Sequence, residues 1–174
     1  MKKTQRAAAV AGLLLCAAGA AVAGDAASAP AAARFTLKDV FVGSMIARDV
    51  VASAIPFDKT WAELTPQQKD IVRDDYESLG PDDEPPFPLH GLREAVTPLV
   101  RQAVTQGAQG KLVASVIVDS EGHGRDVSVY KTPGPDMTTL VARLLAAEQY
   151  KPASCKGQPC SMPFVLRLEF LEHN

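Results

Sequence analysis

Hydrophobic and polar positions between Gly110 and Leu171 follow a succession of different periods, and each period predicts an element. Residues 111–119 are rich in β-branched side chains, which favour a strand, and residues 120–124 have the composition of a turn. Residues 125–131 alternate again, with valines on one side and polar side chains on the other. Apolar residues then recur at helical spacing over 136–148, and residues 161–171 alternate almost without interruption. The pattern predicts strand, strand, helix and strand.

The last strand has two distinct faces. Its apolar face predicts burial, whereas the opposite face carries two charged side chains. Pro163 cannot donate a hydrogen bond to a neighbouring strand, and this suits the start of an edge strand. We therefore expect a half-buried strand with an open edge. The buried face consists of Met162, Phe164, Leu166, Leu168 and Phe170, and the other face of Pro163, Val165, Arg167, Glu169 and Leu171.

The region before this unit predicts helices. Thr36 could cap a helix running to about Ala54, since a mostly apolar set falls loosely on one side of it: Leu37, Val40, Phe41, Ser44, Met45, Val51 and Ile55. Thr65-Pro66-Gln67-Gln68 is a capping box with proline at the first helical position, and it predicts a helix to about Ser78. Residues 34–80 are therefore expected to form a helical segment. Residues 81–91, rich in proline and acids, predict a linker.

A C-terminal domain is expected to follow over residues 92–174. Its first element is a helix from about Leu92 to Gln106, since apolar residues recur on one face and Gly107 closes it.

The first 23 residues have the features of a signal peptide. Lys2, Lys3 and Arg6 precede a run of small apolar residues that ends in an A-x-A cleavage signal, between Ala23 and Gly24. The competing interpretation is an uncleaved membrane anchor, although a run of about 17 residues is short for a bilayer span. Cleavage removes three positive charges, so the net charge changes from −2 to −5. Residues 24–33 then predict a short flexible tether.

Two cysteines follow the signal peptide, Cys155 and Cys160. An even pair in an exported protein predicts a disulfide, and the C-x4-C spacing favours a structural bond over a redox-active one. No arrangement typical of a catalytic centre or a metal site occurs, so we expect a non-enzymatic protein without a cofactor or a metal. The acidic turn around His123 could hold a cation, but a solvated hairpin is the simpler interpretation. The acidic net charge gives no support for nucleic-acid binding.

Residues 86–171 resemble the C-terminal domain of the TonB family. The features that match are the strand after Gly110, the turn Asp119-Ser120-Glu121-Gly122, the element Tyr150-Lys151-Pro152 and the apolar terminal strand. The resemblance implies an α+β fold, a two-layer β-β-α-β domain, here with an N-terminal helical segment. It also implies that a strand edge takes up an extended peptide of an outer-membrane transporter or another envelope protein. On this sequence the pairing strand would be Phe164, Val165, Leu166, Arg167, Leu168 and Glu169.

The sequence therefore predicts a periplasmic module that binds a partner peptide by β-strand addition, with a role linked to outer-membrane transport. Family members that transduce energy keep a membrane anchor and a long proline-rich spacer, and this chain has a cleavable leader and a short tether instead. Two alternatives stay open: an anchored TonB-type transducer for outer-membrane receptors and a divergent envelope enzyme. The sequence also leaves open whether the domain forms a homodimer.

Overall fold

The computed structural model describes residues 33–40 and 47–172. The signal peptide expected over 1–23, its cleavage site at Ala23 and Gly24, and the tether over 24–33 apart from Ala33 lie outside the described residues. Residues 32–174 belong to a single unit. No helix within the two described ranges combines the length and the apolar character that a membrane span requires.

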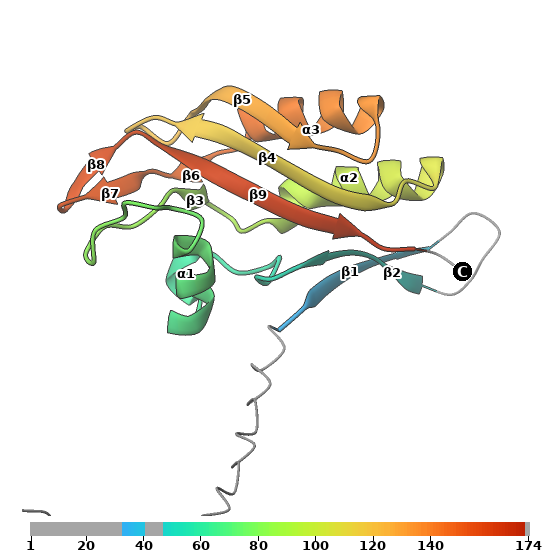
Figure 1. The fold of residues 1–174 in the computed structure, drawn as a ribbon, viewed down its shortest axis with the longest axis horizontal. Helices are drawn as coiled ribbons and strands as arrows, with labels where there is room; N and C mark the ends of the chain where they lie inside the picture. Colours follow the sequence, from blue (N-terminus) through green and yellow to red (C-terminus); the bar gives the residue numbers. More distant parts are fainter. Residues whose placement is uncertain (1–32, 41–46, 173–174) are drawn as a thin grey trace, which may run out of the picture. The chain divides into compact units, whose positions relative to one another are not determined.

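The fold is α+β, as expected, and is built on an antiparallel five-stranded sheet (Figure 1). The strands lie in the order β1-β2-β9-β4-β5, so the last strand in the chain is the central one. They are β1 (Phe35–Val40), β2 (Ala47–Ser53), β4 (Gly110–Val118), β5 (Gly124–Lys131) and β9 (Met162–Phe170).

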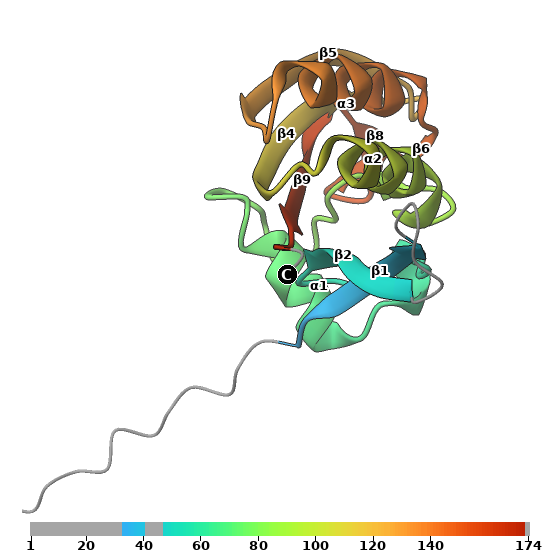
Figure 2. The same cartoon turned by 90° about the vertical axis from the view of Figure 1, so that its right-hand side faces the viewer.

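Two helices cover one face of this sheet (Figure 2). α2 (Arg93–Gln106) packs against β1 and β2, and α3 (Pro135–Ala147) packs against β4 and β5. Both helices were predicted from their apolar spacing, and α2 ends as expected at Gly107, which adopts a left-handed conformation. The apolar side of α2 is fully buried and consists of Ala95, Val96, Leu99, Val100 and Ala103.

The alternation predicted for the terminal strand is confirmed. Phe164, Leu166, Leu168 and Phe170 are at most 4% exposed, and Arg167 on the opposite face is exposed. The prediction that the last strand lies at the edge of the sheet is wrong, because β9 lies between β4 and β2. Alternation specifies which side chains are buried, but it carries no information on how many strands flank the backbone.

The helix predicted from Thr36 to Ala54 is wrong for the residues that the structure describes. β1 and β2 form an antiparallel pair there, and residues 41–46 lie outside the described ranges. Thr36 does not cap a helix; its hydroxyl donates to Asp49 across the pair at 2.9 Å. The apolar residues matched helical spacing only loosely, whereas Val50 and Val51 are β-branched and completely buried. Pairing with β9 therefore decided the local structure.

The helix predicted from the capping box at Thr65 is confirmed. α1 (Pro66–Arg73) begins with the Thr65 hydroxyl accepting the Gln68 N–H at 3.3 Å, and Gln68 Oε1 accepts the Thr65 N–H at 2.9 Å. A 3-10 helix, η1 (Trp61–Glu63), precedes it. α1 ends at Arg73, five residues before the expected end at Ser78, and a turn follows.

The proline-rich segment 81–91 is not a bare linker. β3 (Phe87–Pro88) pairs with β6 (Tyr150–Lys151), and the Phe87 side chain is completely buried between Trp61 and Phe164, with ring centroids 6.0 Å from each. The number of prolines had argued against a regular element. A two-residue strand tolerates them, because Pro88 stands at its end.

A disulfide closes the hairpin that leads into β9. β7 (Ala153–Cys155) pairs with β8 (Gln158–Cys160), and Cys155 is bonded to Cys160 with the two Cα atoms 5.9 Å apart. The predicted disulfide is therefore present. The turn residue Lys156 has a positive φ of 51°, and its backbone N–H donates to Asp83 at 2.7 Å.

Candidate functional site

The terminal strand is paired unequally on its two sides. β4 pairs with β9 along its whole length, from Gly110 opposite Phe170 to Val118 opposite Met162. β2 pairs with β9 only at its end, where Val51 lies opposite Phe170 and Ala52 opposite Glu169. Within the described ranges, no strand pairs with β9 between Met162 and Leu168 on the side of β2.

The backbone groups on this unpaired side belong to alternate residues. The Leu171 N–H donates to the Val50 carbonyl oxygen of β2 at 2.9 Å, so odd-numbered residues direct their backbone groups away from β4. Val165 and Arg167 therefore present backbone groups beyond the point where β2 ends. Part of the edge expected from the sequence is thus open to a further strand, although it is much shorter than the whole of β9.

The turn after α1 covers one end of this opening. The Tyr76 hydroxyl donates to the Pro163 carbonyl oxygen at 2.8 Å, and Arg167 Nε donates to the Asp75 carboxylate at 2.7 Å. Burial raises the pKa of the Tyr76 hydroxyl, so it stays protonated and able to donate at neutral pH. The open stretch therefore runs from this turn to the end of β2.

An apolar pocket of about 270 Å³ lies beside the unpaired stretch. Its floor combines residues of β9 with residues of the N-terminal half of the chain. Asp74 and Asp75 stand among its polar lining. A pocket of this volume and lining can bury an apolar side chain of an added strand. The apolar lining residues are Ala54, Ile55, Ile71, Val72, Leu92, Phe164, Val165 and Leu166.

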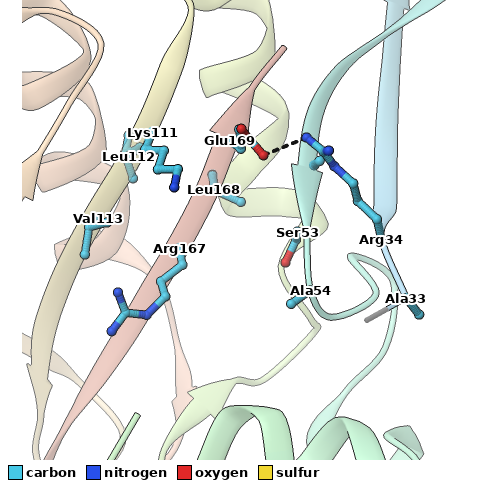
Figure 3. Close-up of a pocket in the computed structure, with 11 residues that line it drawn as sticks. Ala33, Arg34, Ser53, Ala54, Lys111, Leu112, Val113, Arg167, Leu168 and Glu169 are labelled. Carbon is cyan, nitrogen blue, oxygen red and sulfur yellow. Dashed lines mark hydrogen bonds and ion pairs between the residues drawn. The ribbon is translucent and has the colours of Figure 1, made fainter. Parts of the chain in front are cut away.

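A second, more polar pocket of about 370 Å³ adjoins the same gap (Figure 3). Arg34 pairs with Glu169 in it at 2.6 Å, and Lys111 stands opposite Glu169 in the register of β4 and β9. Ser53, Ala54 and Arg167 line both pockets. We call the two pockets together, with the strand ends between them, the β2–β9 groove.

Ser53 places a buried polar group in the groove. Ser53 is only 7% exposed, and its hydroxyl oxygen accepts a hydrogen bond from the Ile55 N–H at 3.2 Å. A hydroxyl that accepts one hydrogen bond keeps its own hydrogen for a second. Ser53 can therefore donate to the backbone carbonyl of a segment bound in the groove.

The six residues predicted to bind a partner all line this groove. Phe164, Val165 and Leu166 line the apolar pocket, Leu168 and Glu169 line the polar one, and Arg167 lines both. Arg167 and Glu169 were predicted as polar contacts to the partner on the solvent side of the strand, and in the structure each has an ion-pair partner, Asp75 and Arg34 respectively.

The sequence pattern did not predict several residues of the groove, because it predicts helices for the segment before residue 80. The available signal for a strand was the pair of β-branched residues Val50 and Val51, because the buried residues of β2 are consecutive and do not alternate. The missed residues are Arg34, Ser53, Ala54, Ile55, Asp75 and Tyr76.

A cleft of about 510 Å³ beside Trp61 gathers many charged side chains, but these hold the surrounding loop together. The Arg73 guanidinium donates to the carbonyls of Gly80, Pro81 and Asp83. Glu84 pairs with Lys151 at 2.9 Å. In the part of the chain that the structure describes, no group of three or more His, Cys, Asp or Glu side chains is arranged to hold a metal ion.

The acidic turn around His123 is likewise engaged by the protein itself. Asp119 accepts the backbone N–H groups of Glu121 and His123 at 3.1 and 2.8 Å, and it pairs with Arg125 at 2.6 Å. Its oxygens therefore organise the turn between β4 and β5.

No protein-family model matches this chain, and no curated protein matches it either.

Proposed function

We propose that this protein is a non-enzymatic periplasmic module, similar to the C-terminal domain of TonB, that binds an extended partner peptide by β-strand addition in the β2–β9 groove. The observation that supports this proposal is the unpaired stretch of β9 beside an apolar pocket. Strand addition obtains affinity from main-chain hydrogen bonds and selectivity from alternate side chains. Val165 and Arg167 supply the main-chain groups, and Ser53 supplies a further donor.

The groove offers different surroundings to successive side chains of an added strand. Successive side chains of a strand point to opposite sides. One side chain of the added strand would therefore enter the apolar pocket, and the next would enter the second pocket, which is the more polar of the two. The apolar pocket lies beside Phe164 and Leu166, and the polar pocket beside Arg34 and Lys111. An extended segment with alternating apolar and polar residues fits this arrangement.

β5 is a less suitable strand for addition, although it forms an edge of the sheet. It carries Arg125, Asp126 and Lys131, and its register with β4 shifts at two places. Charges and bulges are the features by which natural sheets prevent pairing at an exposed edge. The unpaired part of β9 is apolar on its buried side and lies in a groove, which favours selective pairing.

The leader and the disulfide support the proposed compartment, and the partner is the one that the resemblance to the TonB family implies. The bond between Cys155 and Cys160 is typical of an oxidising compartment, and the N-terminal signal directs export. In the periplasm the partner would be an extended segment of an outer-membrane transporter or of another envelope protein.

Chemical-shift mapping tests the proposal. We would titrate the ¹⁵N-labelled protein with a blocked six-residue peptide of alternating threonine and valine. We expect the backbone amides of Ser53, Val165 and Arg167 to shift, because they border the groove. Absence of shifts over residues 162–170 at millimolar peptide would contradict the proposal.

A pair of variants makes the test specific. Ala54 is exposed at the rim shared by the two pockets, so Ala54→Trp should obstruct the groove and weaken binding at least tenfold. Ala146 is an exposed alanine on α3, outside the groove lining, and Ala146→Trp should leave binding unchanged. Equal affinities for the two variants would place the peptide elsewhere.

The anchored transducer is distinguished by the intact mass of the native protein. A chain that begins at Gly24 excludes it, whereas a chain that keeps residues 1–23 supports it.

A further inference from the structure

The Tyr76 hydroxyl occupies a position on β9 that a neighbouring strand would otherwise take. It donates to the Pro163 carbonyl oxygen at 2.8 Å. In a β-ladder, groups two residues apart on one edge are bonded by the backbone of the adjacent strand. Here the Tyr76 side chain takes the place of that backbone at Pro163 and ends the opening on that side.

Asp75 strengthens the same arrangement. Its carboxylate accepts a hydrogen bond from Arg167 Nε at 2.7 Å, and this ties the turn after α1 to the middle of β9. Tyr76 also packs against the core, so the turn is attached by both a polar and an apolar contact. The other limit of the opening is Ala52, the last residue of β2 that pairs with β9.

We propose that Tyr76 determines the length of the strand that β9 accepts, by closing the β2–β9 groove at Pro163 and leaving Val165–Leu168 for pairing. This inference rests on the proposed function of the groove. Four residues of a strand span about 13 Å. A partner segment would therefore pair over about four residues, and its chain must then turn away from the sheet beside Tyr76.

The length dependence of binding tests this inference. Blocked peptides of alternating threonine and valine, with four or eight residues, would be titrated against the wild-type protein and against Tyr76→Phe. For the wild type we expect similar affinities for both lengths. Tyr76→Phe releases the Pro163 carbonyl and loosens the turn, so the eight-residue peptide should bind about three- to tenfold more tightly, which corresponds to one additional hydrogen bond. The four-residue peptide should bind as before.

Tyr130→Phe is the matched control. Tyr130 also stands on the sheet and its hydroxyl lies 3.1 Å from the Ser115 hydroxyl, but it is 70% exposed and belongs to β5. It should change neither affinity. If Tyr76→Phe fails to fold, Asp75→Asn tests the same turn through its other contact, with the same expected direction.

The outcomes separate this inference from the proposed function. If the four-residue peptide shifts the amides of Val165 and Arg167 but Tyr76→Phe has no length effect, the role of Tyr76 is wrong and the groove stands. A wild-type affinity that already rises from four to eight residues also overturns the role of Tyr76. If neither peptide shifts these amides in any of the proteins, the proposed function itself fails.

Discussion

Two aspartates organise loops by accepting backbone N–H groups. Asp83 accepts from Gly80 and Lys156, and so it joins the loop before β3 to the disulfide hairpin. Asp119 accepts from Glu121 and His123 in the turn between β4 and β5. Hydrogen bonds to the charged form lower a carboxyl pKa, and the pKa values of both groups lie below their ordinary values. Both side chains therefore stabilise the fold in their ionised form.

The pH dependence of stability checks this role for Asp119. The backbone N–H of His123, together with the Arg125 guanidinium, lowers the pKa of the carboxyl. A group with a lowered folded pKa stabilises the protein above its unfolded pKa, and this contribution disappears as the pH falls through the folded value. Asp119→Asn should therefore lower the Tm at pH 7, and the difference from wild type should shrink as the pH falls through the folded pKa of Asp119.

Thermal unfolding monitored across that pH range measures the difference. Asp126 lies on the same hairpin in an exposed position, and Asp126→Asn should change the Tm at pH 7 only slightly. A Tm difference for Asp119→Asn that stays the same from pH 7 down into the acid range would show that ionisation has no part in it.

Gly122 illustrates what a turn motif leaves undetermined. The acid-plus-glycine pattern predicts a residue with positive φ, and Gly122 has a φ of 87°. The pattern does not predict that a Cβ atom here would stand 2.2 Å from the Tyr150 carbonyl oxygen. Tyr150 donates its backbone N–H to the Gly122 carbonyl at 3.0 Å, so the turn also contacts a segment distant in sequence.

Among the elements, the disulfide hairpin and β9 form a continuous unit. The hairpin of β7 and β8 turns the chain back into β9, and its turn is attached to Asp83. A closed loop of this size should stabilise the protein through the unfolded state, by about 2 kcal/mol in the chain-entropy description.

Removing both cysteines tests this contribution. Cys155→Ala with Cys160→Ala should lower the free energy of unfolding by about 2 kcal/mol in urea denaturation. Reduction of the wild-type protein with dithiothreitol is the control and should produce a similar loss. An unchanged free energy of unfolding in both experiments would mean that the hairpin is equally constrained without the bond.

The elements that sequence periodicity predicted well are those with one strong period. α2, α3, β4, β5 and β9 all follow their expected ranges within a few residues. The segment of β1 and β2 was predicted as a helix, because its apolar residues fit a helical face loosely and the strand that joins β2 to the sheet, β9, is more than 100 residues away. Strand pairing depends on such distant partners, whereas helix hydrogen bonds are local.

At the scale of the whole molecule, both halves of the chain build one sheet. The expected division into a helical segment, a linker and a C-terminal domain is not what the described residues show, because β2 pairs with β9 and Phe87 packs between Trp61 and Phe164. The N-terminal half contributes large buried side chains to the common core. These include Val50, Val51, Phe57, Trp61 and Leu64, each at most 5% exposed.

A truncated protein tests the unity of the fold. The fragment 81–174 contains the whole expected domain but lacks β1, β2 and α1. Losing these five buried side chains removes roughly 8–15 kcal/mol of gross burial, which is as large as the net stability of a typical domain. The fragment should therefore show neither a cooperative thermal transition nor dispersed amide signals.

The fragment 33–174 is the control and should retain both properties, since it keeps every described strand of the sheet. Cooperative unfolding of 81–174 at the Tm of the longer fragment would show that the C-terminal part is an independent domain after all.

The sequence by itself determined the local properties of this protein: the turn at Gly122, the capped start of α1, the disulfide pair and the two faces of β9. These follow from short-range sterics, hydrogen bonding and the period of apolar residues. Only the tertiary structure decided the neighbours of β9, and with them the groove between Ser53, Tyr76 and Arg167. The edge of a strand is open or closed depending on which other strands pair with it. Those strands are distant in sequence, and their own hydrophobic patterns do not indicate which strand they pair with.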